Sequence, residues 1–169
     1  MDTSMGRIVL MFFPDKAPKT VDNFKTLAKK GFYDGIKFHR VIPGFMIQGG
    51  DPNTKTDAKD SWGSGGPGYT IPDEFSDVSH VRGVLSMAHT SEPNSGGSQF
   101  FIIVKNSLFL DGQYSAFGKV VSGLDVADKI VNVPVVSRSQ PGGPPQPGDD
   151  QPKDPPVIKS VKIEKWPIK

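Results

Sequence analysis

Residues 38–51 read FHRVIPGFMIQGGD, and the rest of the chain can be interpreted as what holds and completes this stretch. Its two apolar runs meet at Pro43-Gly44, a dipeptide typical of turns. Two short strands joined at this turn would bring Arg40 and Gln48 near each other, with apolar side chains between them. Apolar walls with a few placed polar groups are characteristic of a small binding pocket. The stretch therefore predicts a hairpin that carries one side of a pocket.

The rest of the chain predicts further short strands and two helices. Apolar, β-rich runs predict strands at residues 6–13 (buried), 83–88, 98–104, 116–121 and 157–163. Helical spacing of apolar residues predicts one helix from Ala17, with Pro18 in its first turn, and another over residues 124–131. The 19 glycines and 16 prolines favour many turns. Strands and helices do not alternate as in βαβ units. The pattern therefore predicts a closed antiparallel barrel of seven or eight strands with helices packed outside or over its ends.

The composition is that of an ordinary globular protein, and we expect one domain over residues 1–169. A net charge of +2 is too small to indicate nucleic-acid binding. The absence of cysteine excludes disulfides and thiolate metal sites and fits a reducing compartment. Met1–Met5 shows no secretory signal, and no apolar run approaches the ~18 residues that span a bilayer. We therefore expect a cytoplasmic monomer that binds neither nucleic acid nor membrane.

The segment from Pro134 to Pro156 contains half of the prolines in the chain. Proline has no backbone donor and a fixed φ, which excludes a regular helix or a central strand. We expect a flexible, partly extended Pro/Gly-rich loop before the last strand. A ligand for another module is the alternative.

Other motifs that could carry chemistry are weak. The glycine-rich run at residues 63–68 lacks the lysine ending of a phosphate-binding loop. The histidines, His39, His80 and His89, have no metal-ligand spacing. A Ser-His-Asp triad stays open by residue count, although no Gly-x-Ser-x-Gly elbow is present. The carboxylates at residues 73–77 could pair, but a solvated loop is the preferred interpretation. This leaves the pocket predicted around Arg40 and Gln48, which indicates binding or a reaction that needs no proton transfer.

Several long motifs, in register over nearly the whole chain, resemble those of the cyclophilins. They are residues 38–51 and Ser98-Gln99-Phe100-Phe101-Ile102, together with residues 13–21, 85–88 and 117–120. The resemblance implies a mainly β fold, a closed eight-stranded antiparallel barrel capped by two α-helices, in a single-domain, bacterial-like form. It also implies the activity of a peptidyl-prolyl cis-trans isomerase that assists protein folding, acts on proline-containing peptides and unfolded proteins, and needs no cofactor or metal.

The resemblance further implies a role for individual residues around the pocket. Arg40 would be the catalytic arginine. Gln48 and the backbone around Ala88 and His89 would hold the substrate peptide. Four apolar residues would wall the proline pocket, namely Phe45, Met46, Phe101 and Leu110.

Two further residues are expected at the edges of the groove. Gln99 would support its arginine side, and Ser64, with the glycines after it, would lie near a neighbouring specificity pocket.

Two positions depart from the family pattern. Phe109 stands where cyclosporin-sensitive relatives carry tryptophan, and Tyr114 stands where many relatives have a histidine. Phenylalanine lacks the indole donor, so we expect weaker cyclosporin binding with catalysis largely kept, while Tyr114 can still pack and donate. The alternative function is a proline-peptide binding module or chaperone with little catalysis. Arg40 and Gln48 favour the isomerase, because binding alone does not require a group that recognises a twisted bond.

Overall fold

The computed structural model describes residues 1–136 and 148–166, which form short strands, two α-helices and three 3₁₀ turns. The strands are β1 (Asp2–Thr3), β2 (Gly6–Arg7), β3 (Val9–Phe12), β4 (Arg40–Ile42), β5 (Met46–Gly49), β6 (Val84–Met87), β7 (Phe100–Ile103), β8 (Ala116–Ser122) and β9 (Ile158–Ser160). The helices are α1 (Pro18–Lys29) and α2 (Leu124–Val131), and the 3₁₀ turns are η1 (Pro52–Lys55), η2 (Lys59–Ser61) and η3 (Leu108–Leu110).

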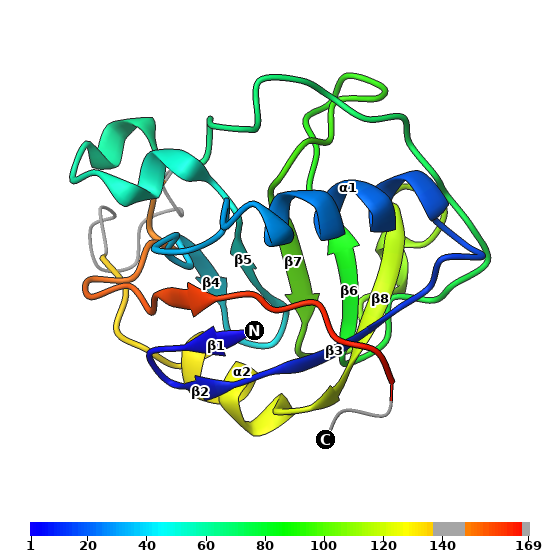
Figure 1. Cartoon of the computed structure of the whole chain (residues 1–169). Helices are drawn as coiled ribbons and strands as arrows, with labels where there is room; N and C mark the ends of the chain where they lie inside the picture. Colours follow the sequence, from blue (N-terminus) through cyan, green and yellow to red (C-terminus); the bar gives the residue numbers. More distant parts are fainter. Residues whose placement is uncertain (137–147, 167–169) are drawn as a thin grey trace.

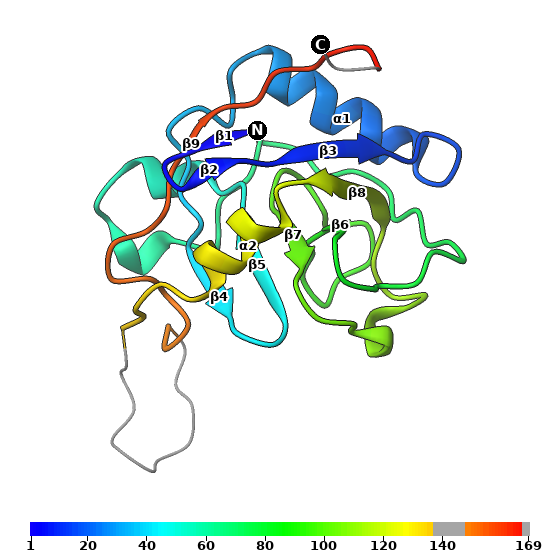
Figure 2. The ribbon, with the colours of Figure 1, turned by 90° about the horizontal axis from the view of Figure 1, so that it is seen from below.

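The strands form two antiparallel sheets. The larger has the order β3-β8-β6-β7-β5-β4, and the smaller has the order β2-β1-β9. The two helices lie at opposite ends of the strand assembly, α1 against β8 and α2 against β4 and β5 (Figures 1 and 2). Both helices agree with the prediction. Neither is long and apolar enough to cross a membrane, and the same holds for every helix of the described residues.

The two sheets are linked at both of their edges. At one edge the chain passes from β2 through Ile8 into β3. At the other, β9 pairs with the segment before β4, where Ile158 N donates to Ile36 O (2.8 Å) and Phe38 N donates to Pro156 O (2.9 Å). The mainly β architecture with two helices is confirmed. The closed eight-stranded barrel stays a prediction, because the strands belong to two sheets rather than one ring.

The prediction of one buried strand over residues 6–13 is wrong in two respects. The segment divides into β2 and β3, and only Ile8 between them is fully buried. β2 is exposed, and Met11 in β3 keeps 39% of its surface accessible. Each of these strands lies at the edge of its sheet, so it is covered less completely than a central strand. The last strand is also shorter than expected, because only Ile158–Ser160 pairs regularly.

The predicted hairpin is confirmed, with its turn at Pro43-Gly44. Arg40 lies opposite Gln48 in the register of β4 and β5, and Gly44 has a φ of 74°, which glycine adopts without strain. Because side chains alternate along a strand, Val41 and Ile47 point into the main core. The residues on either side of them therefore share the opposite face of the sheet.

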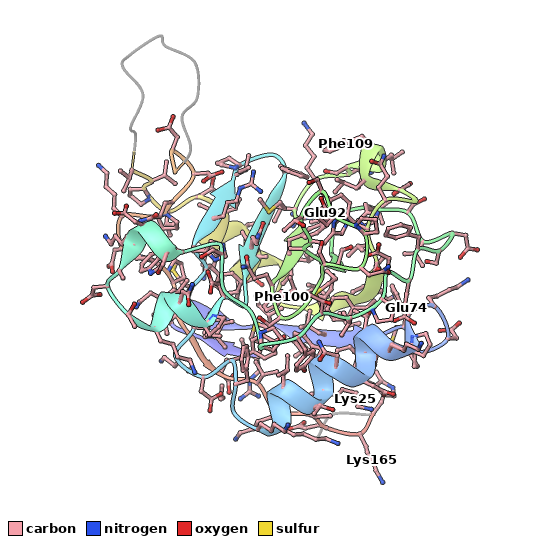
Figure 3. The ribbon with its side chains drawn as sticks, turned by 90° about the horizontal axis from the view of Figure 1, so that it is seen from above. Lys25, Glu74, Glu92, Phe100, Phe109 and Lys165 are labelled. Carbon is pink, nitrogen blue, oxygen red and sulfur yellow. The ribbon has the colours of Figure 1, made fainter. Side chains whose placement is uncertain are left out.

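The core is divided between the two faces of the larger sheet. Under α1, the ring of Phe24 packs on Tyr33, Phe100 and Phe117 with centroid distances of 4.8–5.5 Å. On the other face, a smaller apolar cluster contains Met46, Val84, Phe101, Ile103, Leu110 and Ala116. Strand β7 supplies alternate residues to each, with Phe100 in the main core and Phe101 in the smaller cluster. Figure 3 shows Phe100 in the interior and Phe109 at the surface.

The carboxylate of Glu74 caps α1, which corrects the expectation of a merely solvated acidic loop. The N-cap residue Ala17 provides no side-chain cap. Glu74 instead accepts hydrogen bonds from Thr20 N (2.6 Å), Thr20 Oγ1 (2.8 Å) and Lys19 N (3.2 Å). These donors belong to the first turn, where backbone N–H groups have no partner within the helix. Figure 3 labels Glu74 beside this end of α1.

The Pro/Gly-rich segment is described only at its two ends, since residues 137–147 lie outside the described part of the chain. The ends pair with each other, Val136 N donating to Gln151 O (2.8 Å) and Lys153 N to Pro134 O (2.9 Å). Gln151 is buried, with 6% of its surface exposed. The segment therefore returns to the body of the protein at a fixed place.

We predict that Gly50→Ala lowers the free energy of unfolding by roughly 3 kcal/mol. Gly50 has a φ of 95°, and a Cβ atom there would lie 2.3 Å from Ser98 O. Gly66→Ala is the matched control, because a Cβ atom at Gly66 would meet nothing within 4 Å. Urea denaturation of both variants measures the difference. Equal stability of the two variants would contradict this account of the close approach between Gly50 and Ser98.

Candidate active site

One row of paired residues crosses the larger sheet and defines the site. Arg40 on β4 lies opposite Gln48 on β5, and Gln48 lies opposite Phe101 on β7. A parallel row, two pairs further along and on the same face, joins Ile42, Met46 and Ile103. Residues opposite one another in a sheet share a face. The sheet itself therefore sets a cation, an amide and apolar side chains side by side.

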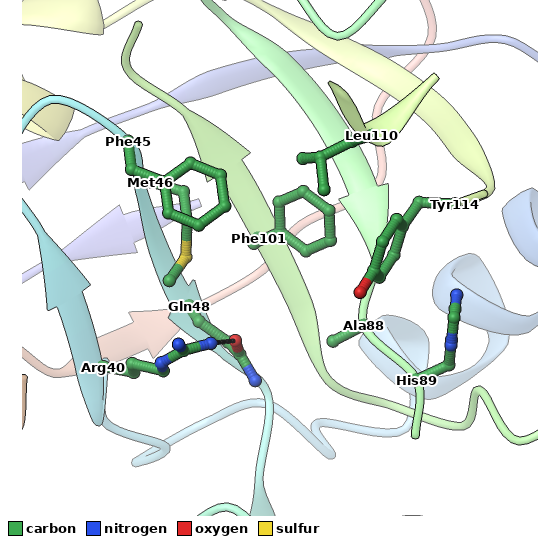
Figure 4. Close-up of a pocket in the computed structure, with 9 residues that line it drawn as sticks. All are labelled: Arg40, Phe45, Met46, Gln48, Ala88, His89, Phe101, Leu110 and Tyr114. Atoms are coloured by element: carbon green, nitrogen blue, oxygen red, sulfur yellow. Dashed lines mark hydrogen bonds between the residues drawn. The ribbon is translucent and has the colours of Figure 1, made fainter. Parts of the chain in front are cut away.

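These side chains surround a pocket of about 130 Å³. Its lining consists of Arg40, Phe45, Met46, Gln48, Ala88, His89, Phe101, Leu110 and Tyr114. Figure 4 shows Arg40 and Gln48 on one side, and Tyr114 and His89 on the other. All nine are among the twelve site residues expected from the sequence. Of the other three, Gln99 bonds to Gln48 and Phe109 packs on Phe45, whereas Ser64 lies in the glycine-rich loop.

A chain of hydrogen bonds leads from the arginine to the glycine-rich loop. Arg40 Nη1 donates to Gln48 Oε1 (3.5 Å), and Gln48 Nε2 donates to Gln99 Oε1 (3.0 Å). Gln99 Nε2 then donates to Gly63 O and Gly65 O, each at 2.9 Å. Because both carbonyls require the amide nitrogen, the oxygen of Gln99 must face Gln48. That orientation in turn directs the oxygen of Gln48 toward Arg40.

Asp51 holds the glycine-rich loop in place, a role that the sequence analysis missed. Its side chain is fully buried and accepts hydrogen bonds from Asn53 N (2.8 Å) and from Gly63 N. A Cβ atom at Gly65 would lie 2.1 Å from Asp51 Oδ1, so only glycine fits there. The loop therefore presents carbonyl oxygens to Gln99, the opposite polarity to that needed for phosphate. An aspartate directly after a glycine pair, before Pro52, was the available signal.

Asp150 forms an ion pair with Arg40 and was also missed. Arg40 Nε donates to Asp150 Oδ2 at 2.7 Å, and the two side chains are 43% and 31% exposed. The backbone of Asp150 is fixed as well, since Val41 N donates to its carbonyl oxygen (2.9 Å). Asp150 belongs to the Pro/Gly-rich segment, 110 residues after Arg40. No local pattern in the sequence signals such a contact.

The opposite wall is built from stacked rings. His89 stacks on Tyr114 with a centroid distance of 4.3 Å, and Tyr114 meets the edge of Phe101 at 5.5 Å. His89 Nδ1 lies 2.6 Å from Thr90 O, and Nε2 lies 2.7 Å from Gln113 O. These contacts join the loop after β6 to the loop after η3. The wall opposite Arg40 is therefore tied together across two loops.

Two of the expected residues are peripheral to the pocket. The ring of Phe109 lies 5.5 Å from that of Phe45 but is 68% exposed, so it forms an outer rim. Ser64 Oγ donates to Ser61 O (2.6 Å) and accepts from Asn53 Nδ2 (3.3 Å). Its hydroxyl thus stabilises the glycine-rich loop.

A Ser-His-Asp arrangement is present but buried beneath the pocket. His80 Nδ1 lies 2.9 Å from Asp111 Oδ1, and His80 Nε2 lies 2.9 Å from Ser86 Oγ. Both His80 and Ser86 have no exposed surface, so a substrate cannot reach the hydroxyl. The His80 ring instead stacks below Phe101, with centroids 6.2 Å apart. These residues support the floor of the pocket and its Leu110 wall, and they do not form a nucleophilic site.

We predict that Asp111→Asn destabilises the protein at neutral pH and that the difference shrinks in acid. The backbone N–H of His80 donates to Asp111 (2.7 Å), and this hydrogen bond lowers the pKa of that carboxyl below its ordinary value of 3.8. When folding lowers the pKa of a carboxyl, the charged carboxyl stabilises the fold at pH values above its unfolded-state pKa. This contribution disappears as the pH falls through the folded-state pKa.

Urea denaturation at pH 7 and below pH 3 measures the effect, with the exposed Asp22→Asn as control. If the difference in unfolding free energy between Asp111→Asn and wild type stays constant over this pH range, the stabilising role of the Asp111 carboxylate is contradicted.

Comparison with known proteins identifies one family. The family model described as "Cyclophilin type peptidyl-prolyl cis-trans isomerase/CLD" matches residues 1–163. A peptidyl-prolyl cis-trans isomerase of Synechococcus elongatus is 48% identical over 145 residues, 81% of this chain and 94% of the relative. Peptidyl-prolyl cis-trans isomerase B of Bacillus subtilis is 46% identical over 135 residues, 79% of this chain and 89% of the relative.

A solved structure agrees over almost the whole chain. The cyclophilin type peptidyl-prolyl cis-trans isomerase of Cryptosporidium parvum, crystallised in the presence of the dipeptide Ala-Pro, superimposes with a TM-score of 0.83 at 33% identity. The match covers 98% of this chain and 97% of that protein. This fold and these relatives define the class of protein, an isomerase of peptide bonds to proline. The chain belongs to the cyclophilin-type peptidyl-prolyl cis-trans isomerases, and its activity is rotation about X–Pro peptide bonds, for which this family needs no cofactor.

Proposed function

We propose that Arg40 is the catalytic residue of this isomerase and that Gln48 acts beside it. Amide resonance opposes rotation about an X–Pro bond with a barrier of about 18–20 kcal/mol. In the twisted transition state the prolyl nitrogen loses conjugation and regains a lone pair, so it accepts a hydrogen bond only there. A guanidinium directed at this nitrogen binds the transition state more tightly than the ground state, which is the requirement for catalysis.

The energetics require more than one hydrogen bond. A charge-assisted hydrogen bond contributes about 1.5–3 kcal/mol, whereas an acceleration of about 10⁴-fold requires about 5.5 kcal/mol. We assign the remainder to the fixed orientation of the guanidinium and of the substrate. The observation that carries this proposal is the row of Arg40, Gln48 and Phe101, which joins the cation to an apolar cavity.

The substrate proline is proposed to enter between the apolar walls of the pocket. Phe45, Met46, Phe101 and Leu110 line the cavity, and a pyrrolidine ring is apolar and small enough to suit it. Gln48 and the backbone at Ala88 and His89 would hold the flanking chain. The structural relative crystallised with Ala-Pro supports this choice of ligand. We therefore propose proline-containing peptides and unfolded proteins as substrates, and assistance to protein folding as the role.

The second candidate is a proline-peptide binding module with little catalysis. The two are distinguished by exchange NMR on a short Ala-Pro peptide with catalytic amounts of protein. Enhanced exchange between the cis and trans signals supports Arg40-centred catalysis. Binding without enhanced exchange supports the module.

We predict that Arg40→Ala reduces kcat/KM roughly 100-fold, because one preorganised donor to the transition state is lost. The fold should survive, since the Arg40 side chain is 43% exposed. Arg82→Ala is the matched control, because Arg82 forms a comparable ion pair with Asp128 away from the pocket. A proline-limited refolding assay compares the variants. Wild-type rates for Arg40→Ala would overturn the catalytic assignment.

We predict that cyclosporin binds weakly and that Phe109→Trp increases its affinity about tenfold, or roughly 1.4 kcal/mol, through the added indole donor. Phe109 is 68% exposed, so the larger ring fits without disturbing the core. Inhibition of catalysis by cyclosporin measures the affinity. Nanomolar inhibition of the unaltered protein would count against the proposal.

The remaining expectations are proposals of the same kind. The two links between the sheets support a closed eight-stranded barrel within a single domain over residues 1–169. The absence of cysteine suits a cytoplasmic location, and we propose that the protein acts there as a monomer.

A further inference from the structure

We propose that Asp150 is a positioning residue that aims the guanidinium of Arg40 into the pocket. The inference rests on the proposed catalytic role of Arg40 and extends the site to the end of the Pro/Gly-rich segment. Asp150 is absent from the residues that line the cavity, so it approaches the arginine from outside. It therefore acts through Arg40 and does not touch the substrate.

The two partners of Arg40 restrain it unequally. The contact with Gln48 joins the guanidinium to an uncharged amide oxygen at 3.5 Å, whereas the contact with Asp150 joins two opposite charges at 2.7 Å. The shorter contact between opposite charges is the stronger of the two. Asp150 also takes the Nε donor, the one nearest the aliphatic part of the side chain, and this leaves both Nη groups with donors for the substrate. Asp150 is thus the main restraint on the direction of the guanidinium plane.

The backbone carrying Asp150 is rigid enough to serve as an anchor. Its carbonyl accepts from Val41 N (2.9 Å), so the backbone of Asp150 is fixed to the strand that carries Arg40. The following residue, Gln151, is buried, and its carbonyl accepts from Val136 N (2.8 Å). Pro152 forms a bridge with Val135. The described ends of the segment thereby hold the acid next to β4.

A role in stability alone is the competing explanation, and exposure argues against it. Both side chains are about one third or more exposed, and ion pairs of this kind contribute little to stability. An exposed arginine without a partner would sample many rotamers, and each misdirected rotamer removes the donor from the twisted bond. Preorganisation of that donor is the effect that accelerates the reaction.

The test compares Asp150→Ala, which removes the acceptor, with Asp150→Asn, which keeps an oxygen acceptor but removes the charge. We expect Asp150→Ala to lower kcat about tenfold while the affinity for an Ala-Pro peptide stays unchanged. The kcat of Asp150→Asn should lie between the kcat of Asp150→Ala and that of wild type. Asp154→Asn is the matched control, because it removes the same charge at an exposed position of the same segment. Exchange NMR measures kcat and peptide affinity in the same sample.

Two further measurements separate positioning from folding. In an Arg40→Ala background, Asp150→Ala should cause no further loss of rate, because Asp150 acts through the arginine. In wild-type protein the Arg40 Nε–H signal should be protected from solvent exchange, and Asp150→Ala should abolish that protection.

The outcomes also separate the two proposals. If Arg40→Ala is as fast as wild type, the catalytic role of Arg40 fails and this inference fails with it. If Arg40→Ala is slow but Asp150→Ala keeps the wild-type kcat, only the positioning role of Asp150 fails. A parallel loss of kcat, peptide affinity and thermal stability in Asp150→Ala would likewise overturn it in favour of a structural role.

Discussion

The antiparallel register that sets Arg40 opposite Gln48, and Gln48 opposite Phe101, is the constraint on which the site depends. A shift of one residue in any of these three strands would turn its side chain toward the main core, because the side-chain period of a strand is two. The hairpin turn at Pro43-Gly44 and the buried residues between them prevent that shift, since Val41 and Ile47 must stay in the core. The packing of the fold therefore fixes the chemistry of its opposite face.

Polar contacts close to the solvent connect this row to the loops around the pocket. Gln99 connects Gln48 to the carbonyls of the glycine-rich loop, and the buried Asp51 fixes that loop from behind. On the other side of the pocket, stacked rings and His89 tie two loops together. The cavity thus lies on a rigid sheet, and three loops form its rim. This arrangement suits a reaction in which the substrate rotates and the enzyme keeps its shape.

The sequence predicted those parts of this structure that depend on local order. The hairpin that brings Arg40 near Gln48, α1 and α2 follow from a turn dipeptide and from apolar periodicity, and the family resemblance implied the nine lining residues. What it could not predict depends on contacts between distant segments. Asp150 meets Arg40 across 110 residues, Glu74 caps α1 from 54 residues away, and His80 reaches Asp111 and Ser86 below the pocket. Edge exposure of β2 and β3 likewise depends on the sheet order, which single segments do not encode.

In the mechanism proposed above, the pairing of Arg40 with a carboxylate would at first sight weaken catalysis, because a nearby negative charge reduces the potential at the guanidinium. The geometry reduces this cost, since both side chains are partly exposed and water already screens the pair. What the transition state offers is one lone pair in one direction, so a donor is effective only when it points along that direction. A flexible side chain gains more from fixed orientation than it loses from partial neutralisation. Under this proposal, the selectivity for the twisted bond arises from the direction in which the guanidinium points, and the sheet, Gln48 and the end of the Pro/Gly-rich segment together set that direction.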